Sequence, residues 1–273
     1  MPASSNRSLL VGLVRAASVA VALGLPFVGN PQPATADWAA LGALPDWSGV
    51  WVPDVAVQRR KERNELPPWA PAAKAQIDVL FAEDSAGRPK LLLDHCLPHG
   101  MPSWMLITHN AMEILVTPGR VTLLGEGDGN RLRRIYTDGR AHPEDPDLTI
   151  HGHSIGHWQG DTLVVDTVGI IPQSYIALSE AVGIPNNGHL HIAERIRLSA
   201  PDTLIDELTI TAPQVLAEPW TTTRLWVRRR GDLYDIVEGQ CVQGDLVEAV
   251  DEHGNAIFEH APPADGGRVP LDR

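Results

Sequence analysis

Three predicted strands each place one carboxylate within an otherwise apolar face: Glu194 in 189–198, Asp166 in 162–168 and Asp206 in 203–211. A buried carboxylate must be paired with a cation, or else burial raises its pKa. A raised pKa near neutrality is what a general acid or base needs. A neighbouring arginine such as Arg133 or Arg224 would instead make a structural ion pair, so both interpretations stay open.

Proton transfer is therefore the leading chemistry. We expect Glu194 and His191 to carry the proton, with Asp166 or Asp138 assisting them. A second group of polar residues follows a predicted strand end, where a barrel meets its ligand, and consists of Tyr136, Asp138, Arg140 and His142. A phenol and a guanidinium there can hold a developing negative charge, although Asp138 followed by glycine also fits an ordinary turn. Substrate contacts are expected from Tyr136, Arg140, His153, His157, Trp158 and Trp220.

The histidines allow a different chemistry. His151 and His153 form one H-x-H pair, and His189 and His191 form another. Residues i and i+2 of a strand share a face, so each pair can offer two imidazoles to one zinc ion. We expect no cofactor. Zinc bound by His151, His153 and His157 is the alternative, and it would make the protein a metal-dependent hydrolase.

The segment 152–156 reads G-H-S-I-G and fits the G-x-S-x-G pattern of the nucleophile elbow in α/β-hydrolases. That elbow needs a strand before the serine and a helix after it. Here a Gly-Asp turn and a further strand follow, so we expect the glycines to allow a tight bend into a strand.

The elements that must position these residues are short alternating runs separated by turn residues, which begin at Met112. About ten strands result, joined mostly by hairpins, and one hairpin pairs 221–229 with 233–238. An amphipathic helix is predicted over 72–83. The pattern favours an all-β antiparallel barrel over a βαβ fold, because closure removes exposed edges and leaves room for one small ligand. The expected division is a signal peptide (1–36), an irregular segment packed on the barrel (37–110), the barrel (111–260) and a flexible tail (261–273).

The first segment has the features of a secretory signal peptide. Arg7 and Arg15 come before an apolar run over 16–24, and Ala34-Thr35-Ala36 offers a cleavage site. The run is too short to span a bilayer, so we expect a periplasmic or secreted protein with no membrane span after cleavage. In such a compartment Cys96 and Cys241 are expected to form a disulfide.

The net charge of −12 argues against a nucleic-acid partner, since phosphate binding draws on clustered lysines and arginines. No dinucleotide or P-loop glycine pattern is present in the sequence. A small apolar or aromatic molecule is the expected ligand.

The blocks R-R-I-Y-T-D-G-R (133–140), G-H-S-I-G-H-W (152–158) and G-D-T-L-V-V-D-T (160–167) resemble those of a large family of uncharacterised secreted bacterial proteins. The resemblance covers roughly 46–240 and implies a secreted β-rich domain, with no reaction attached to it. Gln159 stands where that family usually has glutamate. The segment 47–51 also resembles the G-x-W strand that begins lipocalin-like (calycin) barrels.

These observations together predict an exported enzyme that performs cofactor-free acid/base chemistry, of the isomerase, cyclase or lyase type, on a largely apolar substrate in a barrel pocket. A periplasmic binding protein for a small hydrophobic ligand, without catalysis, is the alternative from a different class. Fold alone does not distinguish them.

Overall fold

The structure, a computed structural model, describes residues 38–89, 92, 98–107, 111–126, 131–231, 235–238, 245–250 and 256–260. The predicted signal peptide, both cysteines of the predicted disulfide and the predicted tail lie outside these residues. Among the helices in this part of the chain, none is both long and apolar enough to cross a membrane.

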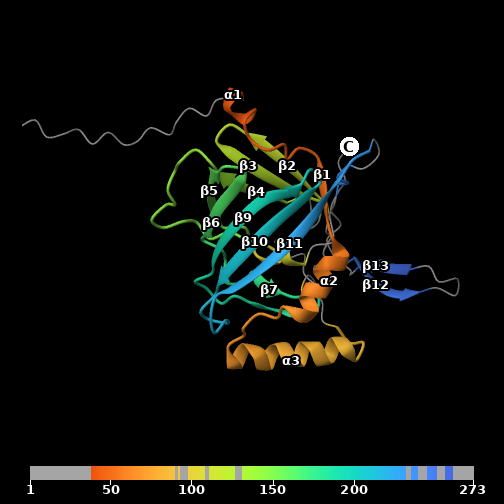
Figure 1. The fold of residues 1–273 in the computed structure, drawn as a ribbon. Coiled ribbons are helices and arrows are strands. Elements are labelled where there is room, and N and C mark those ends of the chain that lie inside the picture. The colour runs from red at the N-terminus through yellow and green to blue at the C-terminus, as the bar shows by residue number, and fades with distance from the viewer. Residues whose placement is uncertain are drawn as a thin grey trace, which may run out of the picture. The chain divides into compact units, whose positions relative to one another are not determined.

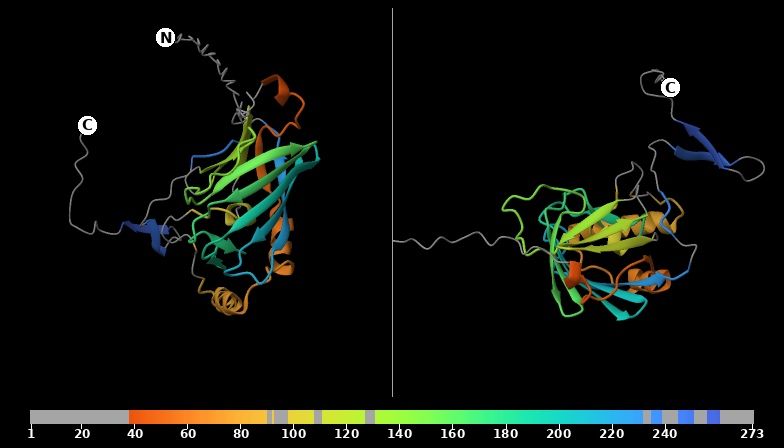
Figure 2. Two further views of the ribbon diagram at one scale, coloured as in Figure 1. Left: turned by 90° about the vertical axis from the view of Figure 1, so that its left-hand side faces the viewer. Right: turned by 90° about the horizontal axis from the view of Figure 1, so that it is seen from above.

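Nine strands form a closed barrel in the order β1, β11, β10, β9, β6, β5, β4, β3 and β2, and β1 pairs with β2 to close it (Figure 1). Figure 2 shows the same strands from two further sides. Their bounds are β1 Val50–Pro53, β2 Met112–Thr117, β3 Arg120–Gly125, β4 Leu132–Tyr136, β5 His153–Gln159, β6 Thr162–Val168, β9 His191–Ala200, β10 Thr203–Thr211 and β11 Trp220–Arg229. The prediction of an all-β barrel with little helix is confirmed.

The remaining elements are short or lie outside the barrel wall. They are α1 Trp38–Leu41, α2 Val55–Asn64, α3 Pro71–Ser85, α4 Ser103–Leu106, β7 Tyr175–Ala177, β8 Gly183–Pro185, β12 Asp245–Val250 and β13 Ala256–His260. The predicted helix is confirmed as α3, which buries Ile77 and packs Leu80 and Phe81 against the core. Sequence reasoning missed α2, which has apolar residues only in its first turn and is polar or charged from Gln58 to Asn64.

The wall of the barrel differs from the expected division in two places. β1, from the segment expected to pack on the barrel, is itself a barrel strand, and β12 and β13 form a separate two-stranded sheet. The predicted pairing of 221–229 with 233–238 is wrong: β11 pairs with β10 and β1, and 235–238 is not a strand. Arg228 of β11 supports the pairing of β11 with β1. Its side chain donates to Asp46 and Ser48, just before β1, and lies 4.5 Å from the ring of Trp51 in β1.

β4 and β5 are the one parallel pair in this wall; every other neighbouring pair of barrel strands is antiparallel. Ile135 pairs with Ser154 and Tyr136 with Ile155. A hairpin cannot join parallel strands, so the chain from 137 to 152 makes a longer connection. This connection contacts the outer face of the barrel, where His142 reaches Asp166 of β6.

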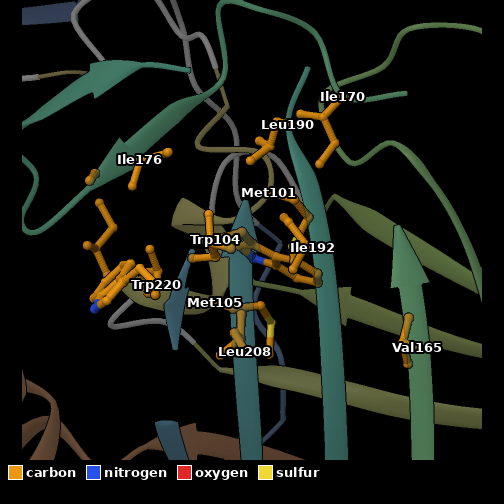
Figure 3. Packing of buried hydrophobic residues seen from close by; sticks show 14 of the residues in the cluster. Met101, Trp104, Met105, Val165, Ile170, Ile176, Leu190, Ile192, Leu208 and Trp220 are labelled. Carbon is orange, nitrogen blue, oxygen red and sulfur yellow. The ribbon is translucent and has the colours of Figure 1, made fainter. Parts of the chain in front are cut away.

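The segment around α4 contributes apolar side chains to the barrel core. Figure 3 shows Trp104 and Met105 near Ile192 and Leu208, all of them buried. The carbonyl oxygen of Leu106, at the end of α4, accepts hydrogen bonds from Arg224 Nε (3.0 Å) and Gln58 Nε2 (2.6 Å). These two bonds satisfy a helix-end carbonyl that would otherwise be buried without a donor.

A polar network lies on the inner face beside this apolar core. Arg133 of β4 and Glu194 of β9 form a two-pronged ion pair, in which Nη1 donates to Oε1 at 2.8 Å and Nη2 donates to Oε2, and both side chains are about 1% exposed or less. Arg133 also donates to Ser154 of β5 (3.2 Å) and Thr167 of β6 (3.0 Å). The network therefore connects four strands through their inward-facing residues.

Asp206 of β10 is the third inward carboxyl group. It is fully buried and lies beside Glu194 and Arg133. Burial, together with the negative charge of Glu194, raises the pKa of Asp206 well above its usual value. The raised pKa favours the protonated, neutral form of this carboxyl group.

Replacing Arg133 tests how strongly the fold depends on the ion pair. Arg133→Met leaves the Glu194 carboxylate buried without its cation, so we expect the free energy of unfolding at pH 8 to fall by about 3–5 kcal/mol. Arg134→Met changes the next residue, which is exposed. The free energy of unfolding of this variant should stay within about 0.5 kcal/mol of the wild-type value. Urea unfolding measures both; equal losses in the two variants would refute the role of the pair.

Replacing Asp206 tests its protonation. Because its pKa is higher in the folded than in the unfolded state, the stability that Asp206 contributes in acid is lost as pH rises toward the folded-state pKa. We expect Asp206→Asn and the wild type to have the same urea midpoint of unfolding near pH 4. At pH 8 the variant should have the higher midpoint. Asp145→Asn, at an exposed position, is the control. A wild type that is more stable than Asp206→Asn at pH 8 would contradict the assignment.

Candidate functional site

Seven side chains gather on the outer face of β4, β5, β6 and β9 and on the connection after β4. They form what we call the outer cluster: Tyr136, Asp138, Arg140, His142, His153, Asp166 and His191. Six of them are among the predicted site residues. The alternation of side chains along a strand places them on the face opposite to Arg133 and Glu194.

His142 stands at the centre of the outer cluster. Its Nδ1 lies 2.8 Å from Nδ1 of His153, and its Nε2 lies 2.9 Å from Oδ1 of Asp166. The other oxygen of Asp166, Oδ2, lies 2.5 Å from Nε2 of His191. Four side chains from three strands and one loop thus form a continuous hydrogen-bonded chain.

The chemistry of the donors sets the proton positions in the neutral form of this chain. An ionised carboxylate only accepts hydrogen bonds, so His142 donates from Nε2 to Asp166, and His191 donates to the other oxygen. Neutral His142 then has a lone pair on Nδ1, and His153 must donate to it from its own Nδ1. The lone pair of His153 is therefore on Nε2, which has no hydrogen-bond partner within the described part of the chain.

Partial burial lowers the pKa of His153 below its usual value, and the charge of His142 in its protonated form and the permanent charge of Arg140 lower it further. A lowered pKa keeps the imidazole neutral at neutral pH, which is the state in which it can accept a proton.

Tyr136, Arg140 and Asp138 support His153 from one side. The ring of Tyr136 stacks on that of His153, with 5.4 Å between centroids and 28° between planes. The guanidinium of Arg140 lies 3.9 Å from the centre of the Tyr136 ring and donates to both oxygens of Asp138. The hydrogen bond from Arg140 lowers the pKa of Asp138, so this carboxylate stays ionised and paired.

A hollow of about 380 Å³ lies beside this arrangement. His153 and Tyr136 line it from the strands, and Pro143, Pro146 and Ile150 line it from the connection between β4 and β5. The hollow is large enough for a small molecule and brings apolar walls next to a neutral imidazole.

Four predicted site residues are not members of the outer cluster, although His157 lines a second hollow with Arg140 and Asp166. Glu194 is inside the barrel, on the opposite face from His191, so the structure does not bring this predicted pair together. Trp158 packs against Trp47, with ring centroids 4.9 Å apart, and Trp220 is part of the buried core. His157 is exposed and lies 3.1 Å from the side-chain nitrogen of Gln159.

Neither H-x-H pair lies within a single strand. β5 begins at His153 and β9 at His191, so His151 and His189 precede the strands, and Gly152 and His189 have positive φ values of 69° and 56°. His151 packs on Trp104, with ring centroids 5.1 Å apart. No group of three His, Cys, Asp or Glu side chains among the described residues has a geometry that could hold a metal ion.

Ser154 of the G-H-S-I-G segment is fully buried inside β5, where its hydroxyl lies 2.8 Å from that of Thr167. It is not on an exposed turn, as the elbow would require. A side chain at Gly152 would collide with the carbonyl oxygen of Val168, which lies 2.5 Å from the point that a Cβ atom would occupy. This close approach agrees with the expected tight bend.

His142 is the one member of the outer cluster to which sequence reasoning assigned no chemical role, although it belongs to the predicted strand-end group. It lies in a connection without periodicity, and its only signal is its place two residues after Arg140. Arg133 was foreseen as one of several possible partners for a buried carboxylate, and the structure assigns it to Glu194.

Removing the charge of Arg140 should change the titration of His153. We expect Arg140→Gln to raise the pKa of His153, because the variant removes one of the positive charges that oppose protonation. The measurement is an NMR pH titration of the imidazole Cε1–H signals. Arg195→Gln, on the outer face of β9, is the control and should leave the pKa unchanged. An unchanged or lower pKa in Arg140→Gln would contradict this electrostatic effect.

Comparison with known proteins adds no assignment to this geometry. No protein-family model matches the chain, and a search of curated proteins finds no match to it.

Proposed function

We propose that the outer cluster is the active site of an exported enzyme that moves a proton on a small, largely apolar molecule, in the manner of an isomerase or lyase. His153 is the general base. The observation that carries this proposal is the chain from Asp166 through His142 to His153, a residue that lines the hollow and whose Nε2 has no hydrogen bond to any described residue.

The chain of three residues prepares His153 for this role. Asp166 holds His142 in the tautomer with its proton on Nε2, and His142 in turn holds the proton of His153 on Nδ1. When His153 takes a proton on Nε2, the resulting positive charge is stabilised by the lone pair of His142 and the nearby Asp166 carboxylate. His191 keeps Asp166 in place through its second oxygen.

Tyr136 and Arg140 complete the proposed mechanism. Stacking on Tyr136 orients the His153 ring. The guanidinium of Arg140 lies over the Tyr136 ring and holds that ring in place. The phenol of Tyr136 donates a hydrogen bond to the oxygen on which negative charge develops when the substrate loses its proton. No cofactor is needed for such a transfer, since the proton returns to the product or leaves with solvent.

The position of the proposed site differs from the barrel pocket expected from the sequence. The barrel interior holds the Arg133–Glu194 pair and the buried rings of Trp51 and Trp226. The outer hollow instead has space for a small substrate and is lined by His153. A non-catalytic binding protein would use the same hollow. It would release its ligand chemically unchanged, whereas an enzyme would release a product.

Exchange of carbon-bound hydrogen for solvent deuterium tests the proposal without a known product. The mature protein is incubated in D₂O with a panel of aryl and alkyl ketones and their keto-acid derivatives, and incorporation is followed by mass spectrometry. We expect the wild type to accelerate exchange in at least one compound. His153→Gln should lower that rate by about 10²-fold or more, because a general base typically contributes 10²–10⁴.

Two further variants sharpen this experiment. His189→Asn replaces an exposed histidine whose positive φ asparagine tolerates, and it should exchange at the wild-type rate. Asp166→Asn should lower the rate less than His153→Gln, since Asp166 acts through His142. Exchange by His153→Gln at the wild-type rate would overturn the assignment of the base.

A further inference from the structure

We infer that the substrate carries a carboxylate and that Arg134 binds it. This inference rests on the proposed proton-transfer site and names its substrate class. Arg134 and Tyr136 alternate with inward-facing residues on β4, so both project from the outer face. Both line the same hollow as His153.

Arg134 differs from its neighbouring arginines in having a charge that no described residue neutralises. Arg133 is paired with Glu194 inside the barrel, and Arg140 is paired with Asp138. For the guanidinium of Arg134, the described part of the chain provides no ion pair, hydrogen bond or ring contact, and the residue is exposed. An unpaired guanidinium at the edge of an apolar hollow is suited to bind a carboxylate through two parallel hydrogen bonds.

One carboxylate shares this hollow with Arg134. Asp147 lines it from the connection between β4 and β5, is exposed, and makes no ion pair with Arg134 or any other described residue. Its negative charge opposes an anionic substrate, so it reduces the affinity that Arg134 provides. The two residues therefore have opposite expected effects on an acid, and neither should affect a neutral analogue.

The spacing along β4 limits the shape of the substrate. The Cα atoms of residues two apart on a strand are separated by about 7 Å, so Arg134 and Tyr136 are neighbours on the outer face and a small substrate can contact both. The lining of the hollow also includes apolar side chains, Leu132 and Ile150 among them. A keto acid with a short apolar chain between its carboxylate and its acidic carbon fits this arrangement.

The reaction step is balanced within such a substrate. The carbon–hydrogen bond next to the ketone breaks, an N–H bond forms at Nε2 of His153, and the electron pair moves onto the ketone oxygen to give an enolate. The proton, or a deuteron from solvent, then returns to carbon. No oxidant, reductant or second substrate takes part.

The test compares 6-oxo-6-phenylhexanoate with its primary amide in the deuterium-exchange assay. For the acid, we expect Arg134→Gln to raise KM by about 10-fold to 100-fold with kcat within about 3-fold, because a charge-assisted hydrogen bond contributes on this scale. Asp147→Asn should lower KM for the acid by a few fold. Arg197→Gln, an exposed arginine on the outer face of β9 outside the hollow, is the control and should change neither value.

For the amide, none of these three variants should change KM. Equal KM values for acid and amide in the wild type, or an Arg134→Gln variant that affects both alike, would overturn the inference. If exchange still depended on His153 in that case, the proposed function would stand. Loss of the His153 dependence itself would refute the proposed function and this inference together.

Discussion

The buried ion pair between Arg133 and Glu194 joins β4 to β9 across the inside of the barrel, and hydrogen bonds from Arg133 to Ser154 and Thr167 add β5 and β6. β4 and β5 need such a connection, because their parallel pairing extends over only two residue pairs and no tight turn sets their register. A shift of one residue would move each inward side chain to the outer face. The network therefore fixes the register of the strands that carry the outer cluster.

The inner network and the outer cluster occupy opposite faces of the same four strands. Ser154 and Thr167 are the direct neighbours of His153 and Asp166 in the sequence, so holding the inner pair in place also positions the outer pair. The two faces differ in chemistry. Inside, Glu194 is paired with a cation and burial raises the pKa of Asp206, whereas outside a hydrogen-bonded chain ends at the imidazole of His153.

Local patterns in the sequence were sufficient for the barrel and for much of the site. Strand alternation placed Glu194 in an apolar row, and it does face inward, while Asp166 faces outward because β6 buries Leu163 and Val165 instead. Contacts made by a loop between two strands could not be predicted from strand alternation. Nothing in the spacing indicates that β4 and β5 run parallel, or that the connection between them brings His142 between His153 and Asp166.

The tautomers of His142 and His153 test the central claim most directly. Two-bond ¹H–¹⁵N correlation spectra distinguish a protonated ring nitrogen from one with a lone pair, and they can be recorded on the mature wild-type protein at a pH where both rings are neutral. We expect His142 to be protonated at Nε2 and His153 at Nδ1, with the lone pair of His153 on Nε2. A proton on Nε2 of neutral His153 would contradict the claim, because that histidine could not then accept a proton from a molecule in the hollow.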